Sequence, residues 1–365
     1  MSMIDPREQE VLDRIERRRR RPHVKLTDRH VTLAHGAGGK SSRVLLETLF
    51  LPELGNALLE PLGDGALLAP DDAGPPRLAF STDSFVVKPL FFPAGDIGEL
   101  AVNGTVNDLA MSGARPRWLS AGFIIEEGLP TEELGRIVAS MGAAARAAGV
   151  AVVTGDTKVV ERGKADGLYV STAGVGTVEH DLALVPTAIR PGDLVLVSGT
   201  IGDHGMAIMV ARGELELEVE LESDTAPLHG LTEALLEAAG PGVRCLRDPT
   251  RGGLATAVNE FALAAEVCIV LDEAAVPVRE EVTGACEILG IDPLYVANEG
   301  KLVTVVAPEL AGEALAALRA HPLGARAEVV GEVRAEPPGM VLLETAFGGT
   351  RVVDMLAGDP LPRIC

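Results

Sequence analysis

Strand-like and helix-like segments alternate through two successive stretches of this chain, and this repeated alternation restricts its fold more than any other feature. In the second stretch, three apolar runs predict strands: DLVLVSG, VCIVLD and LVTVVAP. Each precedes a segment with helical spacing of its apolar residues: TRGGLATAVNEFALAAE, REEVTGACEILG and LAGEALAALRAH. The turn RPGD at residues 190–193 separates this stretch from a first one built in the same way. We therefore predict an α+β fold.

A length of 365 residues is enough for two domains at about 150 residues each. We divide the chain into a basic N-terminal extension (1–30), an N-terminal domain (31–188), a C-terminal domain (189–345) and a tail (346–365). From FGGTRVV onward we expect no regular element, because Pro360 and Pro362 would interrupt one. An extended arm of ten residues reaches roughly 33 to 36 Å, so the tail could carry its last residue into a distant pocket.

The charge of the chain excludes several classes of partner. A formal net charge of −21 opposes binding of nucleic acid or of an anionic membrane surface. The N-terminus is too charged for a signal peptide and no apolar stretch is long enough to span a bilayer, so we expect a cytoplasmic protein. The run Arg17–Arg21 is the exception: it is either a docking arm for an acidic partner or a solvated extension.

The four cysteines show neither a C-x-x-C pair nor histidines at zinc-site spacing. Cys268, in an apolar run, and Cys286, on a predicted helix, are expected to be core residues. Cys365 is the last residue of the chain and has no core to explain it. It is not a prenylation site, because that modification needs the cysteine four residues from the end.

Five aspartates lie in small-residue or apolar surroundings, where a buried carboxylate is unfavourable unless it has a partner. Each taken alone fits a turn or cap residue. If they converge, two carboxylates about 4 Å apart repel by roughly 4 kcal/mol at an effective dielectric constant of 20, so the cluster needs cations. Mg²⁺ prefers such oxygen ligands, and the pattern predicts a Mg²⁺–nucleotide site. The five are Asp64, Asp83, Asp108, Asp156 and Asp248.

A glycine loop, HGAGGKS at His35–Ser41, resembles a P-loop but is not one, because Ala34 stands where that motif needs glycine. It is either an anion-binding lid or a plain turn. Lys158 follows Asp156 by two positions, so both side chains would face the same side of a strand. Glu299 precedes an apolar strand. Alone, Lys158 reads as an exposed salt-bridging lysine and Glu299 as a helix-end carboxylate.

Together, several long motifs resemble the HypE family of [NiFe]-hydrogenase maturation factors. These are STDSFVVKPLFFPAGDIGELAVNGTVNDLAMSGA, GDTKVV, SGTIGDHG, DPTRGGLATAVNEFA, ANEGK and the terminal LPRIC. The resemblance runs from about Val31 to Cys365 and leaves the arginine run outside it. It implies a two-domain AIR-synthase-like (PurM-like) fold with a C-terminal α/β sandwich and a mobile C-terminal tail. It also implies a homodimer formed through the N-terminal domains.

The resemblance further implies an ATP-dependent carbamoyl dehydratase. A carbamoyltransferase, HypF, would load Cys365 as an S-carboxamide. ATP would phosphorylate the carboxamide oxygen, and loss of phosphate would leave a thiocyanate, which supplies cyanide to a HypC–HypD complex for the hydrogenase iron. Rival interpretations are a small-molecule kinase in which the tail cysteine is incidental, and a thiol scaffold without ATP turnover.

The same resemblance assigns roles to individual residues. Glu299 would be the base for the amide proton, and Lys158 would stabilise charge on the phosphate. The five aspartates would bind Mg²⁺. The residues expected to bind ATP are His35, Gly36, Gly38, Gly39, Asp83, Asn107, Asp108, Asp156 and Arg251.

Overall fold

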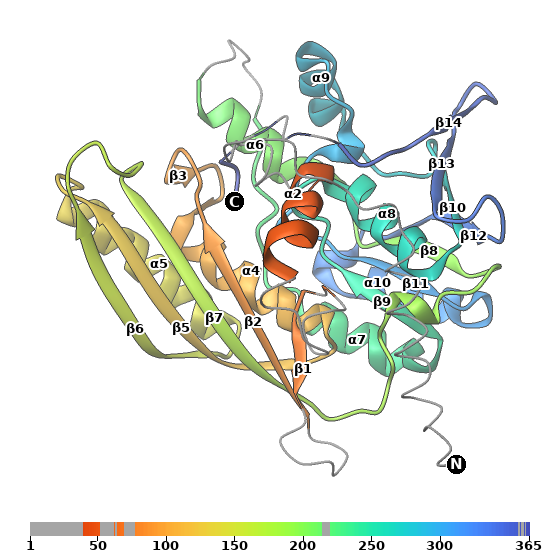
Figure 1. Cartoon of the computed structure of the whole chain (residues 1–365), viewed down its shortest axis with the longest axis horizontal. Helices are drawn as coiled ribbons and strands as arrows, with labels where there is room; N and C mark the ends of the chain where they lie inside the picture. The colour runs from red at the N-terminus through yellow and green to blue at the C-terminus, as the bar shows by residue number, and fades with distance from the viewer. Residues whose placement is uncertain are drawn as a thin grey trace.

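The computed structural model describes residues 39–51, 62, 64–68, 77–213, 220–356, 358, 361 and 363–365. The arginine run and His35, Gly36 and Gly38 lie outside these residues. Figure 1 shows two sheets side by side, with the C-terminus between the two halves. A first short helix, α2 (Lys40–Leu45), continues as a π-helical turn over Leu46–Phe50. No helix in the described part of the chain is long and apolar enough to cross a membrane.

The N-terminal half contains a five-stranded sheet in the order β1-β2-β7-β5-β6. Its strands are β1 (Ala66–Leu68), β2 (Arg77–Phe85), β5 (Arg115–Glu126), β6 (Ala151–Val160) and β7 (Leu168–Val178). A two-stranded ribbon, β3 (Phe91–Phe92) and β4 (Gly95–Asp96), leads into the helix α4 (Ile97–Met111), and α5 (Thr131–Ala147) follows β5.

Helix α4 is the central element of the molecule. It begins at Asp96, whose carboxylate accepts hydrogen bonds from the N–H groups of Gly98 (2.7 Å) and Glu99 (3.1 Å). Almost every residue of α4 is buried, including Asn103 and Asn107, because the N-terminal sheet covers one side and the C-terminal half covers another. A helix that is buried all round has little amphipathic pattern, and its polar side chains must find protein partners.

The C-terminal half contains a seven-stranded sheet in the order β14-β13-β10-β12-β8-β11-β9. The strands are β8 (Leu194–Val197), β9 (Val243–Arg247), β10 (Cys268–Asp272), β11 (Val303–Val306), β12 (Glu328–Arg334), β13 (Met340–Glu344) and β14 (Thr350–Val352). The helices are α6 (Asp203–Ala211), α7 (His229–Ala239), α8 (Gly253–Ala265), α9 (Glu280–Leu289) and α10 (Ala311–Ala320). Short 3₁₀ turns occupy Pro186–Ala188, Gly240–Gly242, Pro293–Tyr295, Pro308–Leu310 and Pro322–Gly324.

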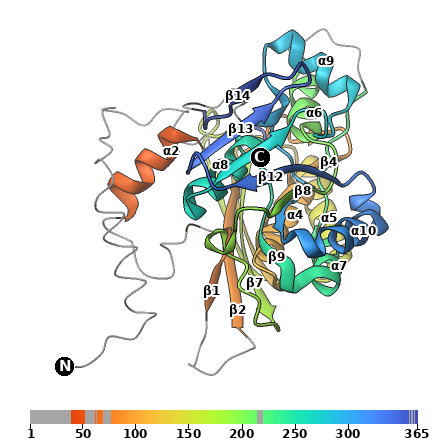
Figure 2. The same ribbon diagram turned by 90° about the vertical axis from the view of Figure 1, so that its right-hand side faces the viewer.

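This sheet is covered on both faces, as the predicted α/β sandwich requires. Helix α8 packs on one face through residues such as Phe261, and α7 and α10 pack on the other through Leu235 and Leu318. Cys268 and Cys286 are buried, as predicted. The prediction of no element after residue 346 is wrong in one place, because β14 pairs antiparallel with β13. Figure 2 shows β14 and α9 near one end of the molecule.

A shared core joins the two halves. One apolar cluster contains Phe85 and Leu100 from the first half and Met206 from the second. Leu361 and Ile364 of the C-terminal tail belong to the same cluster. The tail therefore ends in the contact region between the two sheets, near β3 and α6 (Figure 1).

Candidate active site

Three of the five predicted aspartates converge at the junction of the two halves. Asp64 lies just before β1, Asp108 in the last turn of α4, and Asp248 directly after β9. Carboxylate oxygens of these three residues all lie within 4.8 Å of one another. Asp83 on β2 is near enough for its charge to raise the pKa of both Asp108 and Asp248. Four of the five aspartates therefore share one electrostatic environment.

The carboxylates of this cluster are unfavourable as free anions. Burial, followed by the charges of Asp248, Asp64 and Asp83, holds the pKa of Asp108 well above its usual 3.8. Burial and then Asp64 raise the pKa of Asp248 in the same way. Ser81 donates a hydrogen bond to Asp108, which offsets part of this effect. The cluster needs positive charge to be fully ionised.

One cation of the protein already serves the cluster. The guanidinium of Arg247, at the end of β9, pairs with Asp64 on one side and with Glu260 of α8 on the other. The Arg247 side chain is only 16% exposed, so these ion pairs are screened less than surface pairs. Arg247 lowers the pKa of Asp64 against the larger effect of burial, which raises it. In the described part of the chain, neither Asp108 nor Asp248 forms an ion pair comparable to that of Asp64 with Arg247.

Glu299 is fully buried beside the aspartates. Burial, then the charges of Asp248 and Asp83, hold its pKa well above its usual 4.5. Its backbone is fixed on both sides: its N–H donates to Asp224 (3.0 Å), and its C=O accepts from the side chain of Asn107 (3.1 Å). One carboxylate oxygen, Oε1, is buried without a hydrogen-bond partner. Hydrogen bonds thus hold the main chain of Glu299 on both sides. The carboxylate oxygen Oε1 has no partner and is available to accept a proton.

Two further predicted ATP-binding residues lie around Glu299. The Arg251 charge lowers the pKa of both Asp83 and Glu299, so its guanidinium lies near both carboxylates. Asn107 is 1% exposed, and besides Glu299 it contacts the C=O of Ala226 (3.1 Å) and the N–H of Leu228 (2.7 Å). Its amide therefore joins α4 to two segments of the C-terminal half, and its role towards ATP stays a prediction.

Asp156 and Lys158 lie away from the other four aspartates in the folded structure. They face the same side of β6, as predicted, and Lys158 Nζ lies 2.5 Å from Asp156 Oδ2. The hydrogen bond from Lys158 lowers the pKa of Asp156. However, β6 is separated from β2 by β7 and β5, which amounts to roughly 14 Å at the usual strand spacing. Both side chains are about two-thirds exposed (70% and 68%), and this chain alone does not bring them to the other aspartates.

The described end of the glycine loop packs against the start of the tail. Gly39 is buried, and a Cβ atom there would lie 2.1 Å from the carbonyl oxygen of Leu356. That same oxygen accepts a hydrogen bond from the N–H of Lys40 (2.8 Å). Glycine at position 39 is therefore required by this close approach.

The end of the tail is docked at the junction of the two halves. The backbone oxygen of Cys365 accepts a hydrogen bond from Val86 (3.1 Å), three residues beyond Asp83. The side chain of Cys365 is partly buried and packs on the shared core, whereas the other three cysteines are buried. The terminal cysteine thus lies at the junction of the two halves that also holds the carboxylates.

Comparison with known proteins decides the family. Two family models match the chain: AIR synthase related protein, N-terminal domain, over residues 63–178, and AIR synthase related protein, C-terminal domain, over residues 190–343. A protein named carbamoyl dehydratase HypE from Rhodobacter capsulatus is 54% identical over 344 residues, which are 93% of this chain and 99% of that protein. The chain belongs to the HypE family.

Solved structures of HypE proteins have the same fold as this HypE-family chain. A chain in the crystal structure of a HypE–HypF complex superposes with a TM-score of 0.81 at 47% identity, covering 86% of this chain and 99% of that one. The crystal structure of HypE in complex with ATP gives a TM-score of 0.76 at 49% identity, covering 92% and 100%. The resemblance predicted from the motifs and the AIR-synthase-like fold are both confirmed.

The residues of this HypE-family site fit a divalent cation. Oxygen atoms of three carboxylates lie within 4.8 Å of one another, and carboxylate oxygens are the hard ligands that Mg²⁺ prefers. Burial and neighbouring carboxylates raise the pKa of Asp108 and Asp248, and a bound divalent cation would favour their ionised forms. Asp64, Asp108 and Asp248, with Asp83 beside them, are the residues that would hold it.

Residues to which the resemblance assigns no role also belong to the site. Arg247 and Lys301 are buried cations, and Lys301 Nζ lies 2.9 Å from Asp224, the residue that holds the Glu299 N–H. Arg247 directly precedes Asp248 and could have been suspected from that position alone. Lys301 ends the motif ANEGK, but nothing local in the sequence points to Asp224, and their pairing spans 77 residues.

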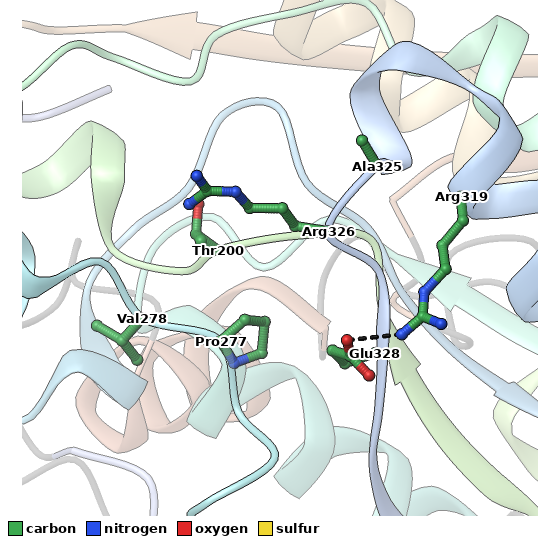
Figure 3. A pocket seen from close by; sticks show the side chains of 7 residues that line it. All are labelled: Thr200, Pro277, Val278, Arg319, Ala325, Arg326 and Glu328. Atoms are coloured by element: carbon green, nitrogen blue, oxygen red, sulfur yellow. Dashed lines mark hydrogen bonds and ion pairs between the residues drawn. The ribbon is translucent and has the colours of Figure 1, made fainter.

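Two cavities lie away from this junction. One of about 540 Å³ is drawn in Figure 3, where Arg319 pairs with Glu328 and the Arg326 side chain extends toward Thr200. The other, of about 500 Å³, lies between α9 and β13. None of the predicted site residues lines either cavity.

Proposed function

We propose that this HypE-family protein uses ATP to dehydrate an S-carboxamide on its own Cys365 to a thiocyanate, which supplies cyanide ligands to a [NiFe]-hydrogenase iron centre. The observation that carries this proposal is the docked tail: the terminal cysteine lies at the same junction as a buried glutamate and four aspartates. HypE relatives are named carbamoyl dehydratases, and one solved HypE is a complex with ATP.

The proposed reaction balances through one phosphorylated intermediate. The carboxamide oxygen attacks the γ-phosphorus of ATP and ADP leaves, which converts a poor leaving group into a good one. The C–O bond then breaks, inorganic phosphate departs with that oxygen, and both amide hydrogens leave as protons while the C≡N bond forms. Glu299 is the proposed acceptor of an amide proton, because its carboxyl is buried at the junction with Oε1 unpartnered and its raised pKa makes it a stronger base than an exposed glutamate.

The proposed ATP site uses Mg²⁺ held by the aspartates. Asp64, Asp108 and Asp248 would bind the ion, and Arg251, near Asp83 and Glu299, is placed to contact phosphate. When bound, Mg²⁺ would neutralise charge on the transferred phosphate. The predicted lid residues His35, Gly36, Gly38 and Gly39 would close over the nucleotide.

We propose a homodimer formed through β6. All but the last residue of this strand is exposed, and Val153 and Val159 are 61% and 67% exposed. A long apolar edge strand invites pairing with another strand. Asp156 and Lys158 point from β6, so dimerisation would bring them to a site that this chain alone does not complete. Their predicted roles as metal ligand and phosphate-stabilising cation depend on this dimer.

The proposed partners are HypF, which loads the cysteine, and HypC–HypD, which accepts the cyanide. The HypF assignment is supported by a solved HypE–HypF complex that this chain resembles at 47% identity. The HypC–HypD assignment and the cytoplasmic location come from the sequence resemblance and composition.

Intact mass spectrometry tests the proposed reaction. The protein is loaded with carbamoyl phosphate by its carbamoyltransferase, separated from nucleotide, and then given ATP and Mg²⁺. We expect an adduct on Cys365 that loses one water only after ATP is added, and no adduct on a Cys365→Ala variant. An adduct indifferent to ATP would favour the thiol scaffold, and ATP turnover that survives Cys365→Ala would favour a small-molecule kinase.

A further inference from the structure

The last three residues of the chain are each held by a hydrogen-bond donor to their backbone oxygen. Cys365 O accepts from Val86 N–H (3.1 Å) and Arg363 O from Lys88 N–H (3.1 Å). Ile364 O, between them, lies 2.5 Å from Nε2 of His204. We propose that Val86–Lys88, His204 and Arg212 form a binding groove for a C-terminal peptide, and that His204 is the positioning residue at its centre.

The groove binds the tail partly as an added strand. Val86 and Lys88 lie two residues apart, and so do their acceptors Cys365 and Arg363, in opposite chain directions. This is the spacing of antiparallel pairing, in which main-chain hydrogen bonds provide the contact and alternate side chains provide selectivity. Arg212 joins both segments, because Nε donates to Lys88 O (2.9 Å) and a terminal nitrogen donates to Arg363 O (2.7 Å).

His204 is built into the protein as a neutral donor. A carbonyl oxygen only accepts, so the nitrogen facing Ile364 carries the hydrogen. The other ring nitrogen, Nδ1, lies 2.8 Å from Ser223 Oγ, and that hydroxyl already accepts from the N–H of Thr225 (3.1 Å). Burial lowers the pKa of His204 and favours the neutral ring, and with its hydrogen on Nε2 the ring accepts a hydrogen bond at Nδ1 from the Ser223 hydroxyl. The ring is fully buried and packs edge-on against Phe92, with centroids 5.6 Å apart.

Side chains of the tail determine which peptide fits. Ile364 is 3% exposed and Leu361 1% exposed, and both pack among Phe85, Val87 and Met206. Arg363 points outward and pairs with Asp166 (2.7 Å) where both side chains are partly exposed. The groove therefore selects a peptide with an apolar residue next to its C-terminus and another three positions before that.

This groove has a consequence that rests on the proposed function. A docked tail holds Cys365 partly buried beside the carboxylates, whereas loading by another protein requires a released tail. The groove then sets the fraction of molecules in each state, and His204 is the contact whose removal shifts that fraction, while Asp64, Asp108 and Asp248 keep their own surroundings.

Alkylation of Cys365 in the full chain measures tail release without any ATP chemistry. The protein is mixed with iodoacetamide without nucleotide, and modification of each cysteine is followed by peptide mass mapping. His204→Phe keeps an aromatic ring beside Phe92 but removes the donor, and we expect alkylation of Cys365 to accelerate roughly 5- to 100-fold. His204→Gln retains an N–H donor, and we expect it to restore a rate close to that of the unchanged protein.

His180→Phe is the matched control. It removes an imidazole contact to a backbone carbonyl of the same kind, Nε2 to Gly113 O at 3.0 Å, at a site that does not touch the tail. We expect no change in Cys365 alkylation for this variant. A His204→Phe rate equal to that of the unchanged protein, or a His204→Gln rate as fast as that of His204→Phe, would overturn the proposal.

A second variant covers the case in which His204→Phe unfolds the protein, which alkylation of the buried Cys245, Cys268 and Cys286 would reveal. Arg212→Gln removes the other side-chain donor to the tail from an exposed position. Faster Cys365 alkylation with protected core cysteines then supports the groove, and an unchanged rate rejects it. Since the assay uses no ATP, its failure leaves the dehydratase proposal to its own test.

Discussion

Replacing Asp248 by asparagine should stabilise the metal-free protein, although it removes a residue of the proposed active site. Asp248 is buried, and its carboxylate lies within 4.8 Å of those of Asp64 and Asp108. At that separation and an effective dielectric constant of 20, each ionised pair costs about 3.5 kcal/mol. Among the charged neighbours of Asp248, Asp64 has the largest unfavourable effect, and Arg247, which pairs with Asp64, offsets part of it.

The gain in the free energy of unfolding is smaller than about 3.5 kcal/mol for each pair. A carboxyl group with a raised pKa can take up a proton instead of repelling its neighbour. Burial and Asp64 raise the pKa of Asp248, so the folded protein binds this proton more tightly than the unfolded chain. Above the unfolded value of 3.8 the folded state therefore loses stability as the pH rises. We expect Asp248→Asn to raise the free energy of unfolding by about 1–3 kcal/mol in EDTA, more at pH 8 than at pH 4, just above the unfolded pKa.

Thermal unfolding with and without Mg²⁺ measures this effect. In EDTA the variant should melt at a higher temperature than the unchanged protein, and added Mg²⁺ should stabilise only the unchanged protein. Asp181→Asn, at an exposed position, is the control and should change stability by less than about 0.5 kcal/mol. A variant less stable than the unchanged protein in EDTA at both pH values would refute the assignment of repulsion to this cluster.

Three further predictions follow from the same structure. Glu299→Gln should retain ATP binding but slow dehydration of loaded Cys365 by roughly 10²- to 10⁴-fold, as measured by intact mass; a normal rate would remove its assignment as base. Lys301→Met leaves the buried carboxylate of Asp224 unpaired and should cost about 3–5 kcal/mol in denaturant unfolding, and a loss below 1 kcal/mol would contradict a buried ion pair. Val153→Asp places charge on the exposed face of β6 and should shift sedimentation from dimer toward monomer, whereas an unaffected dimer would locate the interface elsewhere.

The local sequence pattern predicted which segments form strands and helices better than it predicted which of these elements lie next to one another. The apolar run VCIVLD was predicted to be a strand and forms β10, because a buried strand can be recognised from its own residues. Strand β14 was missed because three residues after a Gly-Gly pair carry no pattern, and its pairing with β13 is set by tertiary structure. Sheet order is likewise non-local.

The predicted site shows the same limit. Long motifs indicated the aspartates, and three of them converge, but nothing in GDTKVV reveals that β6 is an edge strand three positions from β2. Arg247 and the pair Asp224–Lys301 resemble ordinary surface charges in the sequence. Their burial depends on the packing of both halves against α4, which the sequence pattern does not show.

Nucleotide binding and tail docking rest on different chemistry in this molecule. The carboxylates around Asp108 would attract Mg²⁺ through their charge, and salt screens this attraction while the ion approaches from solvent, so binding of the metal should weaken as salt concentration rises. The end of the tail is held by main-chain hydrogen bonds, by a neutral imidazole and by buried apolar side chains; the ion pair between Arg363 and Asp166 is partly exposed and contributes little. Moderate salt should therefore reduce Mg²⁺–ATP affinity while leaving the alkylation rate of Cys365 almost unchanged. This separation allows the cysteine to be presented to the carboxylates or withdrawn from them without first disturbing the charge balance that holds the metal.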